Sequence, residues 1–268
     1  MNYEASVLSP IYKELNKQLV QDNGTKEILF MHAVFDMSRS TGKVDFESRK
    51  SNEGYLKKEL SWYLSLDPTI EKVGDVKIWR SICSKKDSTV NSQYGILVYG
   101  KENGNQFQNA LNSLANDKDS RQAVIIYNRP TIHEEAYEDG KHDFICTFYQ
   151  QFFIRNNKLE CITNMRSNDC IFGIFNDLPW FEYVYNDMYQ RLLNRYINLE
   201  KGSLTYIANS FHCYERHFGV LEKIAEEKNG KPITLTEYLD RTGKHVSAKT
   251  LEKYRDGEHS YSEWAALI

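Results

Sequence analysis

The sequence predicts an α+β domain, and two observations carry that prediction. The stretch Asp143–Trp180 reads as a β-hairpin that runs into a helix. Residues 143–155 are dense in aromatic and β-branched side chains, Asn156-Asn157 is a turn signal, and apolar residues alternate with polar ones over 159–165. Elsewhere, strands and helices do not alternate as βαβ units would require, which favours α+β over α/β.

The other elements follow from hydrophobic periodicity and from stop signals such as Pro68. Helices are expected at residues 7–21, 55–66, 106–114, 178–199 and 249–254. Strands are expected at residues 27–35, 121–127 and 203–208, with a turn at 22–26 and polar loops at 39–52 and 131–143. No repeat or linker divides the chain, so residues 1–268 are taken as one domain that ends in a polar tail, 229–268.

Bulk composition excludes several classes of function. With 268 residues, 41% of them hydrophobic, the chain can bury a large core. The net charge of -3 gives no basic surface for nucleic acid or anionic membranes, so any phosphate recognition must be local. No apolar run is long enough to span a bilayer, and the first residues lack the features of a signal peptide. Five cysteines without CxxC spacing argue against disulfides and metal, and predict a cytoplasmic protein.

Along the predicted hairpin and helix lie polar residues that the alternating pattern of a β-strand does not explain. They are Cys146, Gln151, Arg166, Ser167, Asp169 and Asp177. Each also has an ordinary explanation: Cys146 as a small core residue, Arg166 and Asp169 as a surface ion pair, and Asp177 as the N-cap of the helix near Pro179. A thiol, a guanidinium and two carboxylates on adjacent elements nevertheless indicate a site.

Two further patterns are ambiguous taken alone. Glu59, on the same predicted helix as Trp62, would usually belong to a solvated face. The spacing His212-x-Tyr214-x-x-His217 suggests a metal, but no third ligand is identifiable and the tyrosine suits hydrogen bonding better.

Together these residues resemble one family. The segments that carry the resemblance are KELSWYL (58–64), KIWR (77–80), NSQYG (91–95), DSRQAVIIYNRP (119–130), DFICT (143–147), NMRSND followed by FG and ND (164–177), and GSLTYIANSFHCYERHF (202–218). The chain resembles the thymidylate synthase superfamily, and within it the deoxycytidylate hydroxymethylases of T-even phages. The resemblance covers about residues 22–218 and implies a large mixed β-sheet packed with helices, in a homodimer that joins sheet to sheet.

The resemblance implies a role for each residue that binds or attacks the nucleotide. Cys146 matches the nucleophile, whose thiolate adds to C6 of the pyrimidine so that C5 can attack 5,10-methylenetetrahydrofolate. Arg166 and Ser167 match phosphate ligands, and Arg166 also approaches the thiol. Arg121 matches the arginine that reaches the partner's phosphate across the dimer. The next family arginine is Gln122 here, which weakens that clamp.

The remaining matches are to the base, the sugar, the folate and the N-terminal phosphate loop. Glu59 matches the glutamate that orders water and relays protons, and Tyr94 the tyrosine near the nucleophile and the C5 proton. His212 and Tyr214 match the pair that holds the sugar 3′-hydroxyl. Cofactor-binding matches are Trp79 on the pterin side and Asp169, which accepts pterin N–H bonds. Lys26 is a weak match for the cation of the N-terminal phosphate loop.

Two positions indicate the substrate and the outcome of the reaction. Thymidylate synthases carry asparagine where this chain has Asp177, and a carboxylate suits the amino group of cytosine better than uracil O4. The histidine that follows the nucleophile in thymidylate synthases is Thr147 here, as in the phage hydroxymethylases. We therefore expect dCMP, 5,10-methylenetetrahydrofolate and water to yield 5-hydroxymethyl-dCMP and tetrahydrofolate.

Four alternatives remain open at this point. The first is a CMP hydroxymethylase of nucleoside-antibiotic type, and the second is methyl transfer to dCMP or dUMP with folate as reductant. The third is a catalytically silent relative that binds nucleotide or its own RNA, against which Cys146, Arg166, Asp169 and Tyr94 argue. The fourth is a purely structural protein, which would leave these polar residues without a reason.

Overall fold

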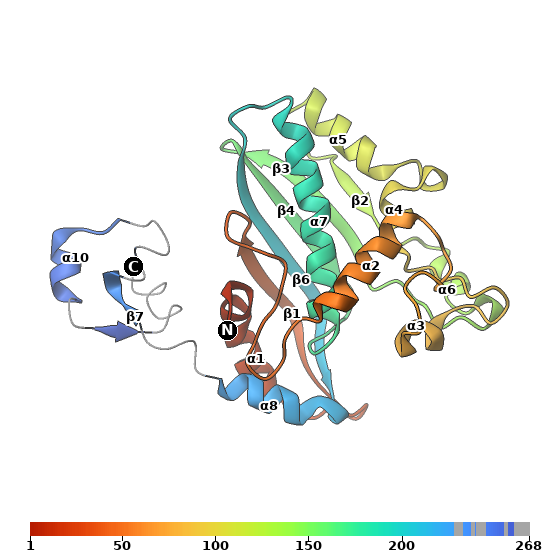
Figure 1. Ribbon diagram of the computed structural model, residues 1–268, viewed down its shortest axis with the longest axis horizontal. Helices are drawn as coiled ribbons and strands as arrows, with labels where there is room; N and C mark the ends of the chain where they lie inside the picture. Colours follow the sequence, from red (N-terminus) through yellow and green to blue (C-terminus); the bar gives the residue numbers. More distant parts are fainter. Residues whose placement is uncertain (228–232, 237–238, 240–244, 255–256, 260–268) are drawn as a thin grey trace.

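A mixed six-stranded sheet forms the centre of the protein (Figure 1). The computed structural model describes residues 1–227, 233–236, 239, 245–254 and 257–259. The strand order is β1-β6-β4-β3-β2, and β5 also pairs with β6. The strands are β1 (Thr25–Asp36), β2 (Val124–Ile126), β3 (Thr147–Arg155), β4 (Lys158–Met165), β5 (Asn168–Asp169) and β6 (Glu200–Tyr214). Because β6 is antiparallel to β1 but parallel to β4 and β5, the expected mixed sheet is confirmed.

The predicted central hairpin is present as β3 and β4. Asn156 and Asn157 both have positive φ, 50° and 59°, as a two-residue hairpin turn between twisted strands requires. The alternation predicted for 159–165 is also confirmed, since Leu159, Cys161 and Met165 are buried. The hairpin therefore presents one face to the core.

Helices pack around this sheet. They are α1 (Tyr3–Lys17), α2 (Glu53–Ser65), α3 (Lys77–Ile82), α4 (Tyr94–Tyr99), α5 (Gln106–Asn116), α6 (Ile132–Glu135), α7 (Gly173–Leu193), α8 (Phe218–Glu226) and α10 (Ala248–Lys253). Figure 1 shows α7 running along the sheet, with α1 and α8 together near β1. The short strands β7 (Ile233–Thr234) and β8 (Glu258–His259) pair with each other.

Several predicted boundaries are wrong. The long helix begins at Gly173 and ends at Leu193, so it continues through Pro179. The sequence predicts a start near that proline because proline breaks helix interiors, but the buried apolar face of the helix begins earlier, with Ile174 and Phe175. The last strand of the sheet is longer than predicted and includes His212. The expected loop 131–143 contains α6 and a 3₁₀ turn at Glu138–Gly140.

One face of the sheet keeps exposed apolar side chains. Val34 on β1 is 50% exposed and Ile126 on β2 is 52% exposed, whereas their neighbours Phe35 and Ile125 are fully buried. In the part of the chain that the structure describes, no helix is long and apolar enough to cross a membrane. Residues 265–268, at the end of the predicted tail, lie outside the described residues.

Candidate active site

Cys146 and Arg166 face each other across the open end of the hairpin. Cys146 directly precedes β3 and Arg166 directly follows β4, and the backbone N–H of Arg166 donates to the Cys146 carbonyl at 2.8 Å. The side chain of Arg166 brings Nη2 to 3.6 Å from the half-buried Cys146 sulfur. Burial raises the pKa of the Cys146 thiol to about 11, while the positive charge of Arg166 opposes that rise.

The guanidinium of Arg166 is held by the strand that carries the thiol. Nε donates to the Ile145 carbonyl at 3.2 Å and Nη2 to the Phe144 carbonyl at 2.8 Å. The group also lies 4.8 Å from the centre of the Phe144 ring. Among the described residues, Nη1 has no hydrogen-bond partner, so two N–H donors remain for an anion.

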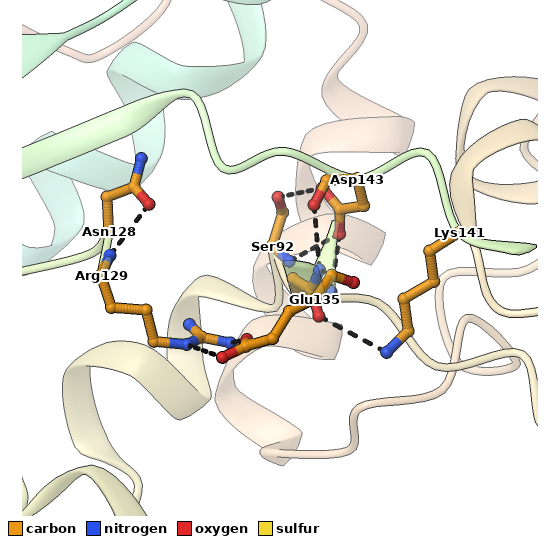
Figure 2. Close-up of polar contacts among 7 residues, drawn as sticks. Ser92, Asn128, Arg129, Glu135, Lys141 and Asp143 are labelled. Carbon is orange, nitrogen blue, oxygen red and sulfur yellow. Dashed lines mark hydrogen bonds and ion pairs between the residues drawn. The ribbon is translucent and has the colours of Figure 1, made fainter. Parts of the chain in front are cut away.

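A buried aspartate ties the segment before Cys146 to the start of α4 (Figure 2). The carboxylate of Asp143, only 3% exposed, accepts from the backbone N–H groups of Asn91 and Ser92 at 2.7 and 2.8 Å. The Ser92 hydroxyl donates to its other oxygen. Burial raises the pKa of Asp143, and these hydrogen bonds oppose the rise. This connection fixes Tyr94, the first residue of α4, relative to the segment that carries Cys146.

Tyr94 lies next to the residue that follows Cys146. Its hydroxyl accepts a hydrogen bond of 2.8 Å from Thr147 Oγ1, and the negative charge of Asp177 is one cause of its raised pKa. Burial is the largest cause and keeps the Tyr94 phenol protonated. Thr147 thus occupies a polar position between the thiol and the phenol.

Asp177 does not cap α7. The helix begins at Gly173 with Phe172 as its N-cap, so Asp177 lies inside it and the N-cap interpretation is wrong. Its Oδ2 accepts a 2.7 Å hydrogen bond from Nδ2 of Asn168. Burial raises the pKa of Asp177 to about 7, and the Asn168 bond opposes that rise. The charge of Asp177 also contributes to the raised pKa of Cys146, so the two groups interact electrostatically.

Glu59 is buried, so the solvated-face interpretation is wrong as well. It is 5% exposed, and its carboxylate accepts from the Tyr55 hydroxyl. That hydroxyl in turn accepts from Trp79 Nε1 at 2.9 Å, which gives a chain from Trp79 through Tyr55 to Glu59. Burial raises the pKa of Glu59 to about 8, and the charge of Asp177 adds to the rise. Sequence reasoning missed Tyr55, although its i, i+4 spacing from Glu59 was a usable signal.

A second group gathers where β5 pairs with β6. Asp169 is in register with His212. Asp169 Oδ1 accepts the backbone N–H groups of Ile171 and Phe172, each at 2.7 Å, and Oδ2 has no hydrogen-bond partner within the described chain. The rings of His212 and Tyr214 pack edge to face, with centroids 5.0 Å apart. Ser167 lies half-buried in the gap between β4 and β5.

Two predicted phosphate ligands, Arg121 and Lys26, make their contacts with residues outside the group around Cys146 and Arg166. Arg121 is exposed near the start of β2, where its carbonyl accepts from Gln151 Nε2 at 2.8 Å. Lys26 donates to the Asn16 carbonyl and lies 5.3 Å from the centre of the Phe218 ring.

The described residues around this site do not form a cluster of metal-binding side chains. In the described ranges, no three His, Cys, Asp or Glu side chains gather closely enough to hold a metal ion. The arrangement instead places a thiol beside a guanidinium, together with two carboxyls of raised pKa, the buried Glu59 and the half-buried Asp177. Such a site can add a nucleophile to an electrophilic ring and move protons around it.

Comparisons with known proteins agree with this chemistry. The family model for thymidylate synthase matches residues 6–258. Deoxycytidylate 5-hydroxymethyltransferase of Enterobacteria phage T4 is 34% identical over 175 residues, covering 64% of this chain and 71% of the phage protein, and that of phage T2 gives the same figures. Thymidylate synthase of Francisella tularensis subsp. holarctica (strain LVS) is 24% identical over 229 residues, or 79% of this chain and 78% of that protein. The protein is therefore an enzyme, a transferase that belongs to the thymidylate synthase family.

Proposed function

We propose that this enzyme converts dCMP, 5,10-methylenetetrahydrofolate and water to 5-hydroxymethyl-dCMP and tetrahydrofolate. The observation that carries the proposal is the half-buried carboxyl of Asp177, which Asn168 holds at 2.7 Å and whose charge acts on Cys146. The similarity to the deoxycytidylate 5-hydroxymethyltransferases of T-even phages supports the choice of substrate and product.

Asp177 would recognise cytosine by its hydrogen-bonding edge. The N4 amino group of cytosine is a donor, which a carboxyl oxygen can accept, whereas uracil O4 would face a carboxylate with no proton between them. A pKa of about 7 lets the Asp177 carboxyl share one proton with cytosine N3 while it still accepts from N4. Mismatched polar edges of this kind can cost roughly 10⁴-fold in kcat/KM.

Cys146 would attack C6 of the bound base. Because its pKa is raised by burial, the thiol is largely neutral in the free enzyme and loses its proton as it adds. Arg166 supports the negative charge on sulfur at that moment, and its Nη1 donors and the Ser167 hydroxyl would take the nucleotide phosphate. His212 and Tyr214 would hold the sugar 3′-hydroxyl, a contact that suits a deoxynucleotide.

Glu59 and Tyr94 would handle the protons of the reaction. With a pKa of about 8, Glu59 can both donate and accept near neutral pH, as a group that delivers water to the exocyclic methylene carbon on C5 must. The Trp79–Tyr55–Glu59 chain fixes the carboxyl orientation. Tyr94, which stays protonated, would orient the water or base that takes the C5 proton, and Thr147 holds its hydroxyl.

The residues present fit a folate co-substrate. Among the described residues, Asp169 Oδ2 has no partner and could accept from N–H donors, while Oδ1 is fixed by two backbone groups. The Trp79 ring, 8% exposed, would line the pterin side. When bound, the folate supplies a one-carbon unit at the oxidation level of formaldehyde.

A second copy of the chain would complete the phosphate site. The sheet face that carries Val34 and Ile126 is apolar and exposed, which suits burial against an identical face in a two-fold homodimer. Arg121, exposed and separate from its own site, would then reach the phosphate bound to the partner subunit. Sedimentation of the purified protein tests this, with a monomer at micromolar concentration as the contrary result.

A product assay tests the reaction itself. Purified enzyme and 5,10-methylenetetrahydrofolate are offered dCMP, CMP and dUMP together in ¹⁸O-labelled water, with Cys146→Ser as the inactive control. Mass spectrometry should find a labelled hydroxymethyl group on dCMP only. A labelled hydroxymethyl group on CMP would instead identify a ribonucleotide as the substrate. An unlabelled methyl product would show that the intermediate is reduced by hydride transfer and not hydrated. No product from any nucleotide would favour a silent relative.

A further inference from the structure

Asn168 is a buried polar residue to which the mechanism above gives no role of its own. It lies on β5, is 3% exposed, and follows Arg166 and Ser167 in the chain. Its amide nitrogen donates to Asp177 Oδ2 at 2.7 Å and lies 3.4 Å from Met165 Sδ. Its amide oxygen is buried without a hydrogen-bond partner in the described part of the chain. An unpaired buried carbonyl is unfavourable, so an apolar residue would be the better choice for stability alone.

The first residue of α7 makes room for this amide. A Cβ atom on Gly173 would lie 2.7 Å from Asn168 Nδ2 and 3.1 Å from Cγ. Gly173 is one helical turn before Asp177, and residues at that spacing share a face of the helix. The Asn168 amide therefore fills the space that a side chain at 173 would take, directly beside the Asp177 carboxyl.

An amide is the neutral group that can serve both protonation states of a carboxyl. Its N–H₂ donates to a carboxylate, and after a half-turn of the amide its oxygen accepts from a protonated carboxyl. Aspartate at this position would place two like charges together, and leucine would offer neither bond. In the arrangement seen, Asp177 Oδ2 is occupied by Asn168, which leaves Oδ1 to face a ligand.

We propose that Asn168 is a positioning residue for base selection, which orients the Asp177 carboxyl and sets whether it carries a proton when the nucleotide binds. This rests on the proposed function, since it assigns to Asn168 part of the discrimination between cytosine and uracil. Asn168 acts through Asp177 and has no separate contact with the reacting carbon in this assignment.

Steady-state kinetics of Asn168→Leu, a variant of similar size, tests the proposal. We expect kcat/KM for dCMP to fall about tenfold to hundredfold, as small misplacements of a recognition group do, with a smaller change for dUMP. The pH profile adds a readout that a merely structural role would not move. The ionisation of Asp177 is the step in the pH profile of kcat/KM that disappears in Asp177→Asn. In Asn168→Leu this step should move to higher pH, because the Asp177 carboxylate loses a hydrogen-bond donor and its pKa rises.

A double-mutant cycle sharpens the test. If Asn168 acts only through Asp177, then Asn168→Leu should have little further effect on kcat/KM in the Asp177→Asn background. Gly173→Ala should mimic Asn168→Leu in part, because the added Cβ displaces the amide. Asn2→Leu is the matched control: Asn2 also makes partly buried hydrogen bonds, at the start of α1, and its loss should lower the melting temperature without changing base preference.

The outcomes separate this proposal from the function on which it rests. Both the proposed function and the role of Asn168 are supported if the wild-type enzyme prefers dCMP and Asn168→Leu loses this preference and shifts the Asp177 step of the pH profile. A wild-type enzyme that prefers dCMP, with Asn168→Leu reducing dCMP and dUMP equally and leaving the pH profile in place, overturns the role of Asn168 alone. A wild-type enzyme with no preference for dCMP overturns the substrate assignment, and the positioning role with it.

Discussion

Arg166 lies 3.6 Å from the Cys146 sulfur while it donates to the Phe144 carbonyl, two residues before that cysteine. The same guanidinium therefore fixes the backbone that carries the thiol and supplies the positive charge closest to it. Burial and the charges of Asp177 and Asp143 raise the pKa of the thiol, and Arg166 is the group that lowers it. This relationship predicts how the reactivity of Cys146 depends on its neighbour.

Arg166→Gln should make the Cys146 thiol less reactive. Loss of the positive charge raises the thiol pKa, so the thiolate fraction at pH 8 falls and alkylation by iodoacetamide should slow by about tenfold. The reaction is followed by mass spectrometry in a Cys83→Ala background, because Cys83 is the other cysteine that is not fully buried. Arg155→Gln is the matched control, since Arg155 also bonds a strand carbonyl and lies near a phenylalanine ring. Equal rates for both variants would contradict the assigned role of Arg166.

Cys146→Ser should abolish the chemistry and leave the fold intact. Serine has nearly the shape of cysteine but is a far weaker nucleophile at this site, so turnover of dCMP should fall roughly 10³-fold or more. Exchange of the C5 proton of dCMP with solvent should stop as well, because exchange requires addition at C6. The melting temperature should change little. Exchange that persists in the variant would show that another residue attacks the ring.

The hairpin and most of the sheet could be predicted from local pattern. Alternation over 159–165 and the Asn156-Asn157 turn identify β3 and β4, and strand pairing then places Cys146 opposite Arg166. The start of α7 could not be predicted in the same way. Proline at 179 is a strong local signal against a helix interior, yet burial of the face that begins at Ile174 extends the helix over it.

The site residues were found by resemblance, whereas their environments needed the structure. Glu59 and Asp177 both look like ordinary surface or capping residues in the sequence, and only tertiary packing reveals that burial raises their pKa values to about 8 and about 7. Tyr55 and Asn168 were missed because their roles depend on which groups they touch. A residue that acts through a partner leaves little trace in composition or spacing.

Asp177→Asn should move base preference from cytosine toward uracil. An amide cannot share a proton with cytosine N3 but can accept from uracil N3–H and donate to O4. We expect the ratio of kcat/KM for dCMP to that for dUMP to fall by roughly 10²-fold or more. Competition assays with both nucleotides in one reaction measure this ratio directly. An unchanged ratio would leave Asp177 without a role in base selection.

Glu182→Gln should change how stability depends on pH. Glu182 on α7 is 4% exposed, lies near buried Glu4, and accepts from the Ser40 hydroxyl. Burial raises its pKa to about 7, so the folded protein binds this proton more tightly than the unfolded chain does. The stabilisation is therefore complete below the unfolded pKa of about 4.5 and is lost as pH rises through about 7.

Urea unfolding at pH 5 and at pH 8 tests this prediction. Glutamine keeps an oxygen for Ser40 but cannot ionise, so the difference in unfolding free energy between the two pH values should shrink by on the order of 2 kcal/mol. Glu14→Gln, at an exposed position on α1, is the control and should leave the difference unchanged. Because Glu59 and Asp177 also have raised pKa values, part of the pH dependence should remain in Glu182→Gln. A difference equal to that of the wild type would mean that the Glu182 carboxyl is stabilised as strongly in its ionised form as in its neutral one.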